Sequence, residues 1–164
     1  MIQVKVAASR GTRMDKAPDL WSHVLPEPGR SLKTKSIMAG RRILIVDDEE
    51  GFRDGVADLL QMEGYTVSVA RDAFEAVRVL PVFRPEVILL DLRMPNLDGE
   101  GFLRGMTGLP ASRGVPVVLI SAKEDLAQIA SRTGAAGYLS KPFEAPQLLS
   151  LLEKVLPEPR TRRR

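Results

Sequence analysis

Residues 86–91, with the sequence EVILLD, decide the fold, because they form a short apolar strand that ends in Asp91. Three other strand-like runs also lead into polar residues: RRILIV (41–46) before Asp47 and Asp48, VPVVLI (115–120) before Ser121, and AAGYLS (135–140) before Lys141. In a parallel α/β sheet, ligands bind outside the carboxyl ends of the strands, so residues that end successive strands converge there. We therefore expect three carboxylates, one hydroxyl and one ammonium to share a pocket, a set that indicates phosphate chemistry.

Helical patterns alternate with these strands from Arg41 onward, and Asp72 is placed to cap one of the helices at its N-terminus. Strands that are apolar throughout and alternate with helices predict a parallel sheet covered on both faces. Right-handed crossovers then make the sheet doubly wound. The expected strands are 41–46, 65–70, 86–90, 115–120 and 135–140, and the expected helices are 51–63, 72–80, 99–107, 123–132 and 145–156.

The charge of the chain is segregated along its 164 residues. Residues 1–40 carry a net +4, residues 41–156 a net −4 and residues 157–164 a net +3. An acidic body with basic ends does not favour nucleic acid as the partner of the folded part. We expect residues 1–39 to be a disordered extension, residues 40–156 to be one domain, and residues 157–164 to be a basic tail.

The composition excludes several kinds of site. Cysteine is absent, which excludes disulfides, thiolate zinc sites and a cysteine nucleophile, and fits a reducing cytosol. The single histidine, His23, excludes a Ser-His-Asp triad or a multi-histidine metal site within one chain. Residues 99–105 have the wrong glycine spacing for a dinucleotide-binding loop. No apolar run approaches the ~18 residues of a membrane span.

Four strings, in this order and near this spacing, resemble the receiver domain of two-component response regulators. They are ILIVDDE (43–49), ILLDLRMPNLDG (88–99), VVLISA (117–122) and GYLSKPF (137–143). The resemblance covers about residues 40–156 and implies a flavodoxin-like (βα)5 fold with strand order 2-1-3-4-5. It also implies Mg²⁺-dependent phosphorylation of one aspartate by a histidine kinase.

The resemblance assigns metal-binding roles to the acidic residues. Asp91 would be the phosphoacceptor and would bind Mg²⁺ directly together with Asp48, while Asp47 would hold the ion through water. The backbone carbonyl of Arg93 would complete the protein ligands. Mg²⁺ prefers oxygen ligands and keeps several waters, so this set suits it. The cation would also offset the repulsion between three carboxylates and an incoming phosphoryl group.

Further residues would act on the phosphoryl group or respond to it, again by resemblance. Lys141 would pair with the phosphoryl oxygens and Ser121 would donate a hydrogen bond to one of them. Pro142 matches the cis-proline site that aims the lysine, and Tyr138 matches the aromatic that moves inward with Ser121. Arg93 and Lys123 occupy variable positions that influence the phosphoryl lifetime. On spacing alone, a half-buried edge tyrosine explains Tyr138 nearly as well.

The sequence as a whole predicts a stand-alone receiver of the CheY-like type, which is not an enzyme in the usual sense although it can assist its own phosphorylation and dephosphorylation. Its expected partners are a sensor histidine kinase or phosphotransfer protein and a downstream protein, with self-association as another way to pass the signal on. We expect a cytoplasmic location. One alternative is a receiver-fold interaction module that does not use phosphorylation. Another is a tether to nucleic acid or membrane through the basic tail, Arg160 and 162–164.

Overall fold

The computed structural model describes residues 39–94 and 99–156. The expected extension before residue 39 and the expected basic tail at 157–164 lie outside the described residues, as does the loop at 95–98. The division of the chain into these three parts therefore stays a prediction.

The strands form one parallel sheet of order β2-β1-β3-β4-β5, which confirms the flavodoxin-like doubly wound class. The central strand β3 pairs with β1 on one side and β4 on the other, and β5 stands at an edge. The strands are β1 (Arg42–Val46), β2 (Thr66–Ala70), β3 (Val87–Leu90), β4 (Val117–Ser121) and β5 (Gly137–Ser140).

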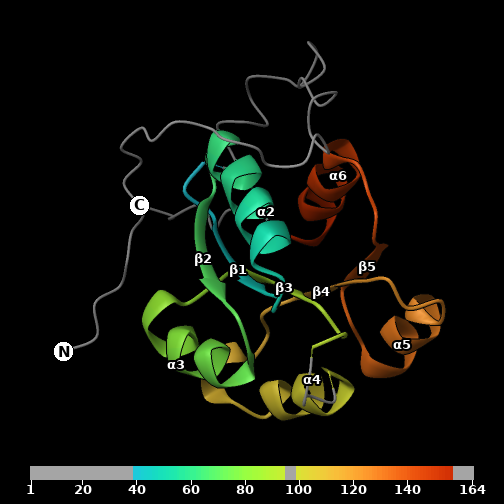
Figure 1. Ribbon diagram of the computed structural model, residues 1–164. Coiled ribbons are helices and arrows are strands. Elements are labelled where there is room, and N and C mark those ends of the chain that lie inside the picture. The colour runs from blue at the N-terminus through green and yellow to red at the C-terminus, as the bar shows by residue number, and fades with distance from the viewer. Residues whose placement is uncertain (1–38, 95–98, 157–164) are drawn as a thin grey trace.

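Helices cover both faces of this sheet, with α2 and α6 on one face and α3, α4 and α5 on the other (Figure 1). The helices are α2 (Glu50–Met62), α3 (Ala73–Phe83), α4 (Gly99–Thr107), α5 (Leu126–Thr133) and α6 (Ala145–Val155), and η1 (Pro110–Ser112) is a short 3-10 helix. None of the helices in the described ranges combines the length and the apolar composition that a membrane span requires.

Two apolar cores explain why the central strands are apolar throughout. Successive side chains of a strand point to opposite faces, and here both faces are covered. In β3, Ile88 and Leu90 pack into the core beneath α3, α4 and α5, while Val87 and Leu89 pack into the core beneath α2 and α6. Since neither face of β3 meets water, no polar residue is needed until Asp91 follows the strand.

Three of the boundaries that differ from those expected have an identifiable structural cause. Helix α3 continues past Leu80 through Pro81 to Phe83, because Arg84 adopts a left-handed conformation (φ 51°) and caps the helix with a backbone hydrogen bond to Leu80. Helix α5 begins at Leu126 rather than at residue 123, because Leu126 is its first buried side chain. Strand β4 includes Ser121, which we had expected to follow the strand, because Ser121 pairs with Ser140 of β5. Asp72 caps α3 as predicted, accepting a hydrogen bond from the backbone of Glu75.

Two glycines shape the connection into the edge strand. Gly134 ends α5 with φ 71°, a conformation that residues with a Cβ rarely adopt. Gly137 begins β5, where an added Cβ would lie 2.8 Å from Cδ1 of Leu151 on α6. The lack of a side chain at Gly137 therefore lets α6 pack closely against the strand that leads to Lys141.

Candidate functional site

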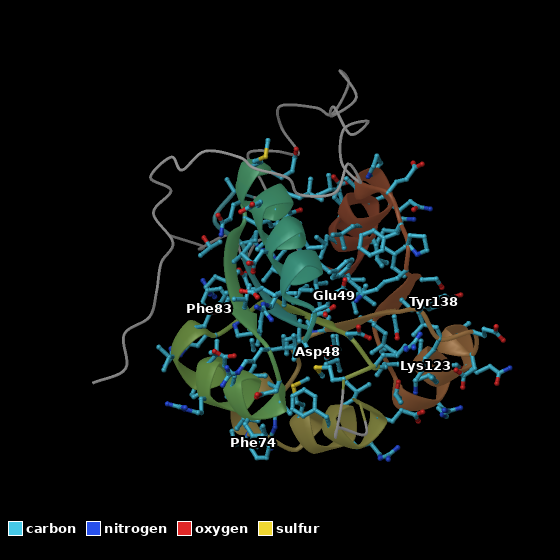
Figure 2. All side chains as sticks on the ribbon, in the orientation of Figure 1. Asp48, Glu49, Phe74, Phe83, Lys123 and Tyr138 are labelled. Carbon is cyan, nitrogen blue, oxygen red and sulfur yellow. The ribbon has the colours of Figure 1, made fainter. Side chains whose placement is uncertain are left out.

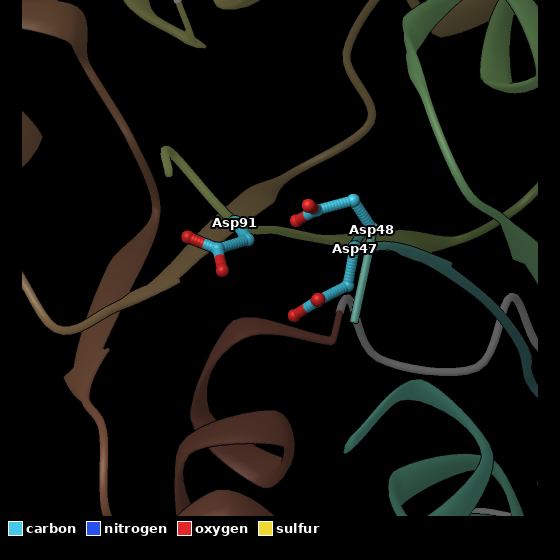
Figure 3. Close-up of side chains that lie close together, drawn as sticks. All are labelled: Asp47, Asp48 and Asp91. Atoms are coloured by element: carbon cyan, nitrogen blue, oxygen red, sulfur yellow. The ribbon is translucent and has the colours of Figure 1, made fainter. Parts of the chain in front are cut away.

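Three carboxylates meet at the carboxyl edge of the sheet, as their positions in the sequence predict (Figure 3). Asp47 and Asp48 follow β1, Asp91 follows the adjacent strand β3, and one carboxylate oxygen from each lies within 4.8 Å of the others. Asp47 and Asp91 are 2% and 6% exposed, while Asp48 is open to solvent. The backbone ladder continues to both buried residues, because Asp91 donates a hydrogen bond to the carbonyl of Val46 and Asp47 donates one to the carbonyl of Ala70. The cluster is thus held by the sheet itself.

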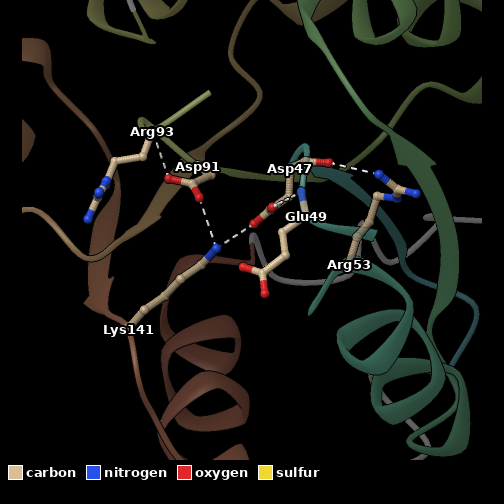
Figure 4. Close-up of polar contacts among 6 residues, drawn as sticks. All are labelled: Asp47, Glu49, Arg53, Asp91, Arg93 and Lys141. Atoms are coloured by element: carbon tan, nitrogen blue, oxygen red, sulfur yellow. Dashed lines mark hydrogen bonds and ion pairs between the residues drawn. The ribbon is translucent and has the colours of Figure 1, made fainter. Parts of the chain in front are cut away.

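Lys141 reaches this cluster from the end of the edge strand β5 (Figure 4). Its Nζ lies 2.7 Å from Oδ2 of Asp47 and 2.9 Å from Oδ2 of Asp91, so it bridges the two buried carboxylates. The Lys141 backbone N–H donates to the carbonyl of Ser121, which fixes the start of the side chain. The peptide bond between Lys141 and Pro142 is cis, the conformation that the resemblance implies.

The other oxygens of the two buried carboxylates are held in matching ways. Oδ1 of Asp47 accepts from the backbone N–H of Glu49 at 2.9 Å, and Oδ1 of Asp91 accepts from that of Arg93 at 2.8 Å. Such bonds to a residue two positions on are typical of aspartate at a turn. Arg53 supports the first turn by donating to the Asp47 carbonyl at 3.0 Å. Each carboxylate is therefore oriented by one backbone amide and one ammonium.

Burial and hydrogen bonding have opposite effects on the pKa values of Asp47 and Lys141. Burial raises the pKa of Asp47 above its usual value, although hydrogen bonds from Lys141 and the Glu49 backbone oppose the rise. Burial lowers the pKa of Lys141, but hydrogen bonds to Asp47 and Asp91 outweigh this and place the pKa above its usual value. The lysine is therefore a cation at neutral pH. One cation among three carboxylates leaves the site with an excess of negative charge.

Ser121 and Tyr138 occupy different environments on neighbouring strands. Ser121 is fully buried at the end of β4, and its hydroxyl has no hydrogen-bond partner within the described part of the chain. A buried hydroxyl without a partner is costly, and a group arriving at the pocket can offer one. Tyr138 is 47% exposed at the sheet edge, where Figure 2 shows it turned outward. Of the predicted set, Lys141 thus contacts both Asp47 and Asp91, and Ser121 lies at the end of β4, next to β3.

Phe52 and Arg53 also lie at the site, although neither was predicted to belong to it. The Phe52 ring packs against the core, and its centroid also lies 3.7 Å from Nζ of Lys141. Both residues lie in the first turns of α2, directly after the acidic pair. Their position in the sequence just after Asp47 and Asp48 could have predicted this, since the start of that helix must lie near the same pocket.

A doubly wound α/β fold with buried aspartates and a lysine at the carboxyl edge of its sheet defines a class of proteins suited to binding metal ions and phosphate. Comparison with known proteins narrows this class, because residues 43–153 match the family model of the response regulator receiver domain. The chain therefore belongs to the response regulator receiver family of two-component systems, whose members are not enzymes in the usual sense.

Individual relatives agree with this assignment. The response regulator MprA of Mycobacterium tuberculosis is 33% identical over 117 residues, which cover 70% of this chain and 50% of the relative. The chain thus spans about half the length of the curated relatives that it matches. Among solved structures, the chemotaxis protein CheY4 of Vibrio cholerae has a TM-score of 0.67 and 32% identity, covering 72% of this chain and all of that one.

One further structure bears on metal binding. The receiver domain of the sensor histidine kinase PA1611 from Pseudomonas aeruginosa has a TM-score of 0.64 and 30% identity, covering 72% of this chain and 98% of that one. It was solved with a magnesium ion coordinated in its active-site cleft. The three carboxylates of the present chain are oxygen donors of the kind that Mg²⁺ prefers.

Proposed function

We propose that this chain is the phosphoacceptor of a two-component phosphorelay, and that Asp91 receives a phosphoryl group from a histidine kinase or phosphotransfer protein. The observation that carries the proposal is the environment of Asp91. Its carboxylate is buried, oriented by the Arg93 backbone at 2.8 Å and approached by Lys141 at 2.9 Å. This arrangement provides a fixed nucleophile with a cation beside it.

The transfer requires positioning and charge stabilisation more than bond activation by the protein. A carboxylate oxygen of Asp91 would attack the phosphorus of a phosphohistidine, and the bond from phosphorus to the histidine nitrogen would break with its electron pair going to that nitrogen. The product is an acyl phosphate on Asp91. Lys141 would pair with the phosphoryl oxygens, and the hydroxyl of Ser121 would donate to one of them and gain the partner that it lacks.

Asp47, Asp48, Asp91 and the backbone carbonyl of Arg93 would hold Mg²⁺ in this site. The fit rests on the carboxylate oxygens of the three aspartates, which lie within 4.8 Å of one another. A bound divalent cation offsets the charge of the carboxylates and of the phosphoryl oxygens. The backbone amides of Glu49 and Arg93 would keep the carboxylates of Asp47 and Asp91 oriented when the cation binds.

Phosphorylation would change the conformation of the surface formed by α5, β5 and α6. Ser121 ends β4 and pairs with Ser140 of β5, two residues beyond Tyr138. Movement of Ser121 toward a phosphoryl group would let Tyr138 turn inward from its exposed position. The altered surface would then bind a downstream protein or a second copy of the chain. A cytoplasmic location is part of the same proposal.

The proposal is tested by incubating the protein with Mg²⁺ and acetyl phosphate beside Asp91→Asn. We expect the intact mass to rise by one phosphoryl group in the unchanged protein and not in the variant. Beryllofluoride, a phosphoryl mimic, should shift the amide NMR signals around Ser121 and Tyr138 under the same conditions. Absence of both responses would overturn the proposal and favour a receiver-fold module that binds its partner without phosphorylation.

The alternative of a tether through the basic tail, residues 157–164, has a separate test. If Arg160 and residues 162–164 bind nucleic acid or an anionic membrane, binding should weaken steeply as salt rises. Deletion of residues 157–164 should abolish that binding. Binding that does not depend on salt, or that survives the deletion, would exclude the tether.

A further inference from the structure

The ammonium of Lys141 is enclosed by an aromatic ring as well as by carboxylates. The centroid of the Phe52 ring lies 3.7 Å from Nζ of Lys141, while Asp47 and Asp91 lie at 2.7 and 2.9 Å. The Lys141 side chain is 14% exposed, so little water is left around the charge. A cation over an aromatic face is attracted by the electrons of the ring, and the attraction is strongest where water is excluded.

A second ring supports the first. Phe143, two residues after Lys141, meets Phe52 edge to face with ring centroids 5.7 Å apart and planes at 88°. Aromatic pairs prefer this arrangement because the positive edge of one ring meets the negative face of the other. Both rings also pack against the core beneath α2 and α6. The Phe52 ring is therefore held by contacts other than the one it makes with the ammonium.

A lysine side chain needs such support because it is long and flexible. Ordering a lysine side chain costs more conformational entropy than ordering most others. Two carboxylates attract the ammonium, but both are ligands that a divalent cation would also use. The contact with the Phe52 ring does not depend on those carboxylates, so it would remain when their charge is shared with a cation or a phosphoryl group.

We propose that Phe52 is a positioning residue that keeps the Lys141 ammonium at the pocket when the carboxylates are engaged elsewhere. The part of this role that concerns the phosphoryl group rests on the proposed function. A second consequence does not rest on it. Because Lys141 occupies Oδ2 of both Asp47 and Asp91, a ring that holds the ammonium there disfavours a competing divalent cation.

A simple packing role for Phe52 makes different predictions from a positioning role. If the ring only fills space, leucine should replace it well, and any harm should affect every property of the pocket in the same direction. If the ring holds the ammonium, tyrosine should preserve its effects and leucine should not. The informative variants are therefore Phe52→Leu, which keeps an apolar side chain, and Phe52→Tyr, which keeps the ring. Phe74→Leu on α3 is the matched control, because Phe74 is 83% exposed on α3, which covers the opposite face of the sheet from α2 (Figure 2).

The contact itself can be measured without any phosphodonor. In protein labelled with ¹³C and ¹⁵N at lysine, we expect the ε-methylene protons of Lys141 to be shifted upfield by the ring. The signal is assigned by its loss in Lys141→Arg. Phe52→Leu should remove the upfield shift, whereas Phe52→Tyr and Phe74→Leu should retain it. An unshifted Lys141 signal in the unchanged protein would overturn the proposal.

The functional consequence is measured on the same variants. For Phe52→Leu we expect the Mg²⁺ affinity, titrated by amide NMR shifts, to rise about threefold and the rate of phosphoryl gain from acetyl phosphate at saturating Mg²⁺ to fall about threefold, as loss of one cation–ring contact implies. Phe52→Tyr should keep the Mg²⁺ affinity and the rate of phosphoryl gain at the values of the unchanged protein. Unchanged values in Phe52→Leu, equal changes in both variants, or a parallel fall in affinity and rate would each overturn the positioning role.

Failure of the proposed function gives a separate result. If Asp91 accepts no phosphoryl group, the unchanged protein itself shows no mass increase. The ring shift and the change in Mg²⁺ affinity would then still decide whether Phe52 holds Lys141 in place.

Discussion

The two sides of the pocket are built on strands with very different surroundings. Strands β1 and β3 are central, and all four residues of β3 are buried. Strand β5 is an edge strand in which partly buried and exposed residues alternate, with Tyr138 47% exposed. The carboxylates directly follow the central strands, whereas Tyr138 lies on the edge strand and Lys141 directly follows it. The fixed acidic side and the proposed responding side of the site are thus separated within the sheet.

This difference indicates where a conformational change costs least. A central strand is held by hydrogen bonds on both sides and by cores on both faces, so its displacement disturbs much of the domain. An edge strand is paired on one side, and regions with few buried contacts open with the lowest free energy. Because the acceptor Asp91 follows β3 and the responding residues lie at β5, the surface at β5 can move while the carboxylates keep their positions.

The largest expected effect comes from a matched pair of leucines that face the same core. Leu89 of β3 is 1% exposed, while Leu139 of β5 is partly buried. Leu89→Ala should lower the free energy of unfolding by about 2–5 kcal/mol, because it leaves a cavity in a closed core. Leu139→Ala should lower it by about 1 kcal/mol, since part of that side chain already meets water. Urea denaturation measures both values, and equal losses would contradict the contrast between the two strands.

A smaller effect is expected on the acidic side itself. Without added metal, the three carboxylates lie close together and the ammonium of Lys141 pairs with only two of them, so Asp48→Asn should raise the free energy of unfolding by ~0.5–1 kcal/mol through relief of repulsion. Mg²⁺ should stabilise the unchanged protein, because a ligand that binds the native state alone shifts the unfolding equilibrium. The variant should lose most of this stabilisation.

Thermal denaturation with and without MgCl₂, against NaCl at equal ionic strength as control, measures both changes. Equal stabilisation of the two proteins by Mg²⁺ would remove Asp48 from the metal site. A less stable variant would show that Asp48 contributes contacts that outweigh its repulsion.

On the edge side, Tyr138→Phe should hardly change stability, because the side chain is exposed and the ring is retained. We expect a change within ~0.5 kcal/mol. Tyr138→Ala should be similarly tolerated, yet it should reduce the beryllofluoride-induced shifts on β5 and α6 if the ring carries the change in the surface. Amide NMR on the phenylalanine and alanine variants decides this, and full shifts in the alanine variant would separate Tyr138 from the response.

The sequence predicted the architecture because the two signals that define it are local. Apolar strands ended by polar residues and helices of a few turns were enough to give the strand order through the family resemblance, and to bring Asp47, Asp48 and Asp91 to one edge. The contact between Phe52 and Lys141 was not predictable in the same way. It joins residues far apart in the sequence, and the Phe52 ring that makes it is itself held by the Phe143 ring from another part of the chain.

The helix and strand boundaries that were predicted wrongly depend on features that the local sequence does not show. The start of α5 depends on where burial begins, at Leu126, and the polar residues before it give no signal of their own. The last residue of β4 is set by pairing with Ser140, a partner on another strand. Helix α3 runs through Pro81 because its end is set by the backbone of Arg84, whose left-handed conformation residue type alone does not predict.

The smallest expected effect concerns how α5, the helix beside the responding edge, is held. Arg132 of α5 donates two hydrogen bonds to the carboxylate of Glu100 on α4, at 3.0 and 2.6 Å. The hydrogen bonds from Arg132 lower the pKa of Glu100 below its usual value. A lowered carboxyl pKa means that the pair stabilises the fold above the ordinary glutamate pKa, and that the contribution is lost as pH falls through the lowered value. Glu100→Gln should therefore melt slightly below the unchanged protein at pH 7, and this difference should shrink in acid and in high salt.

Glu124→Gln is the matched control for this pair, because Glu124 is exposed just before α5 and the described residues show no ion pair for it. It should melt like the unchanged protein at every pH at which Glu100→Gln differs. A difference for Glu100→Gln that persists unchanged into acid would mean that packing, and not charge, joins the two helices. In that case α5 would be held as firmly as the central strands, and the contrast between a fixed acceptor side and a movable edge would have to be drawn at β5 alone.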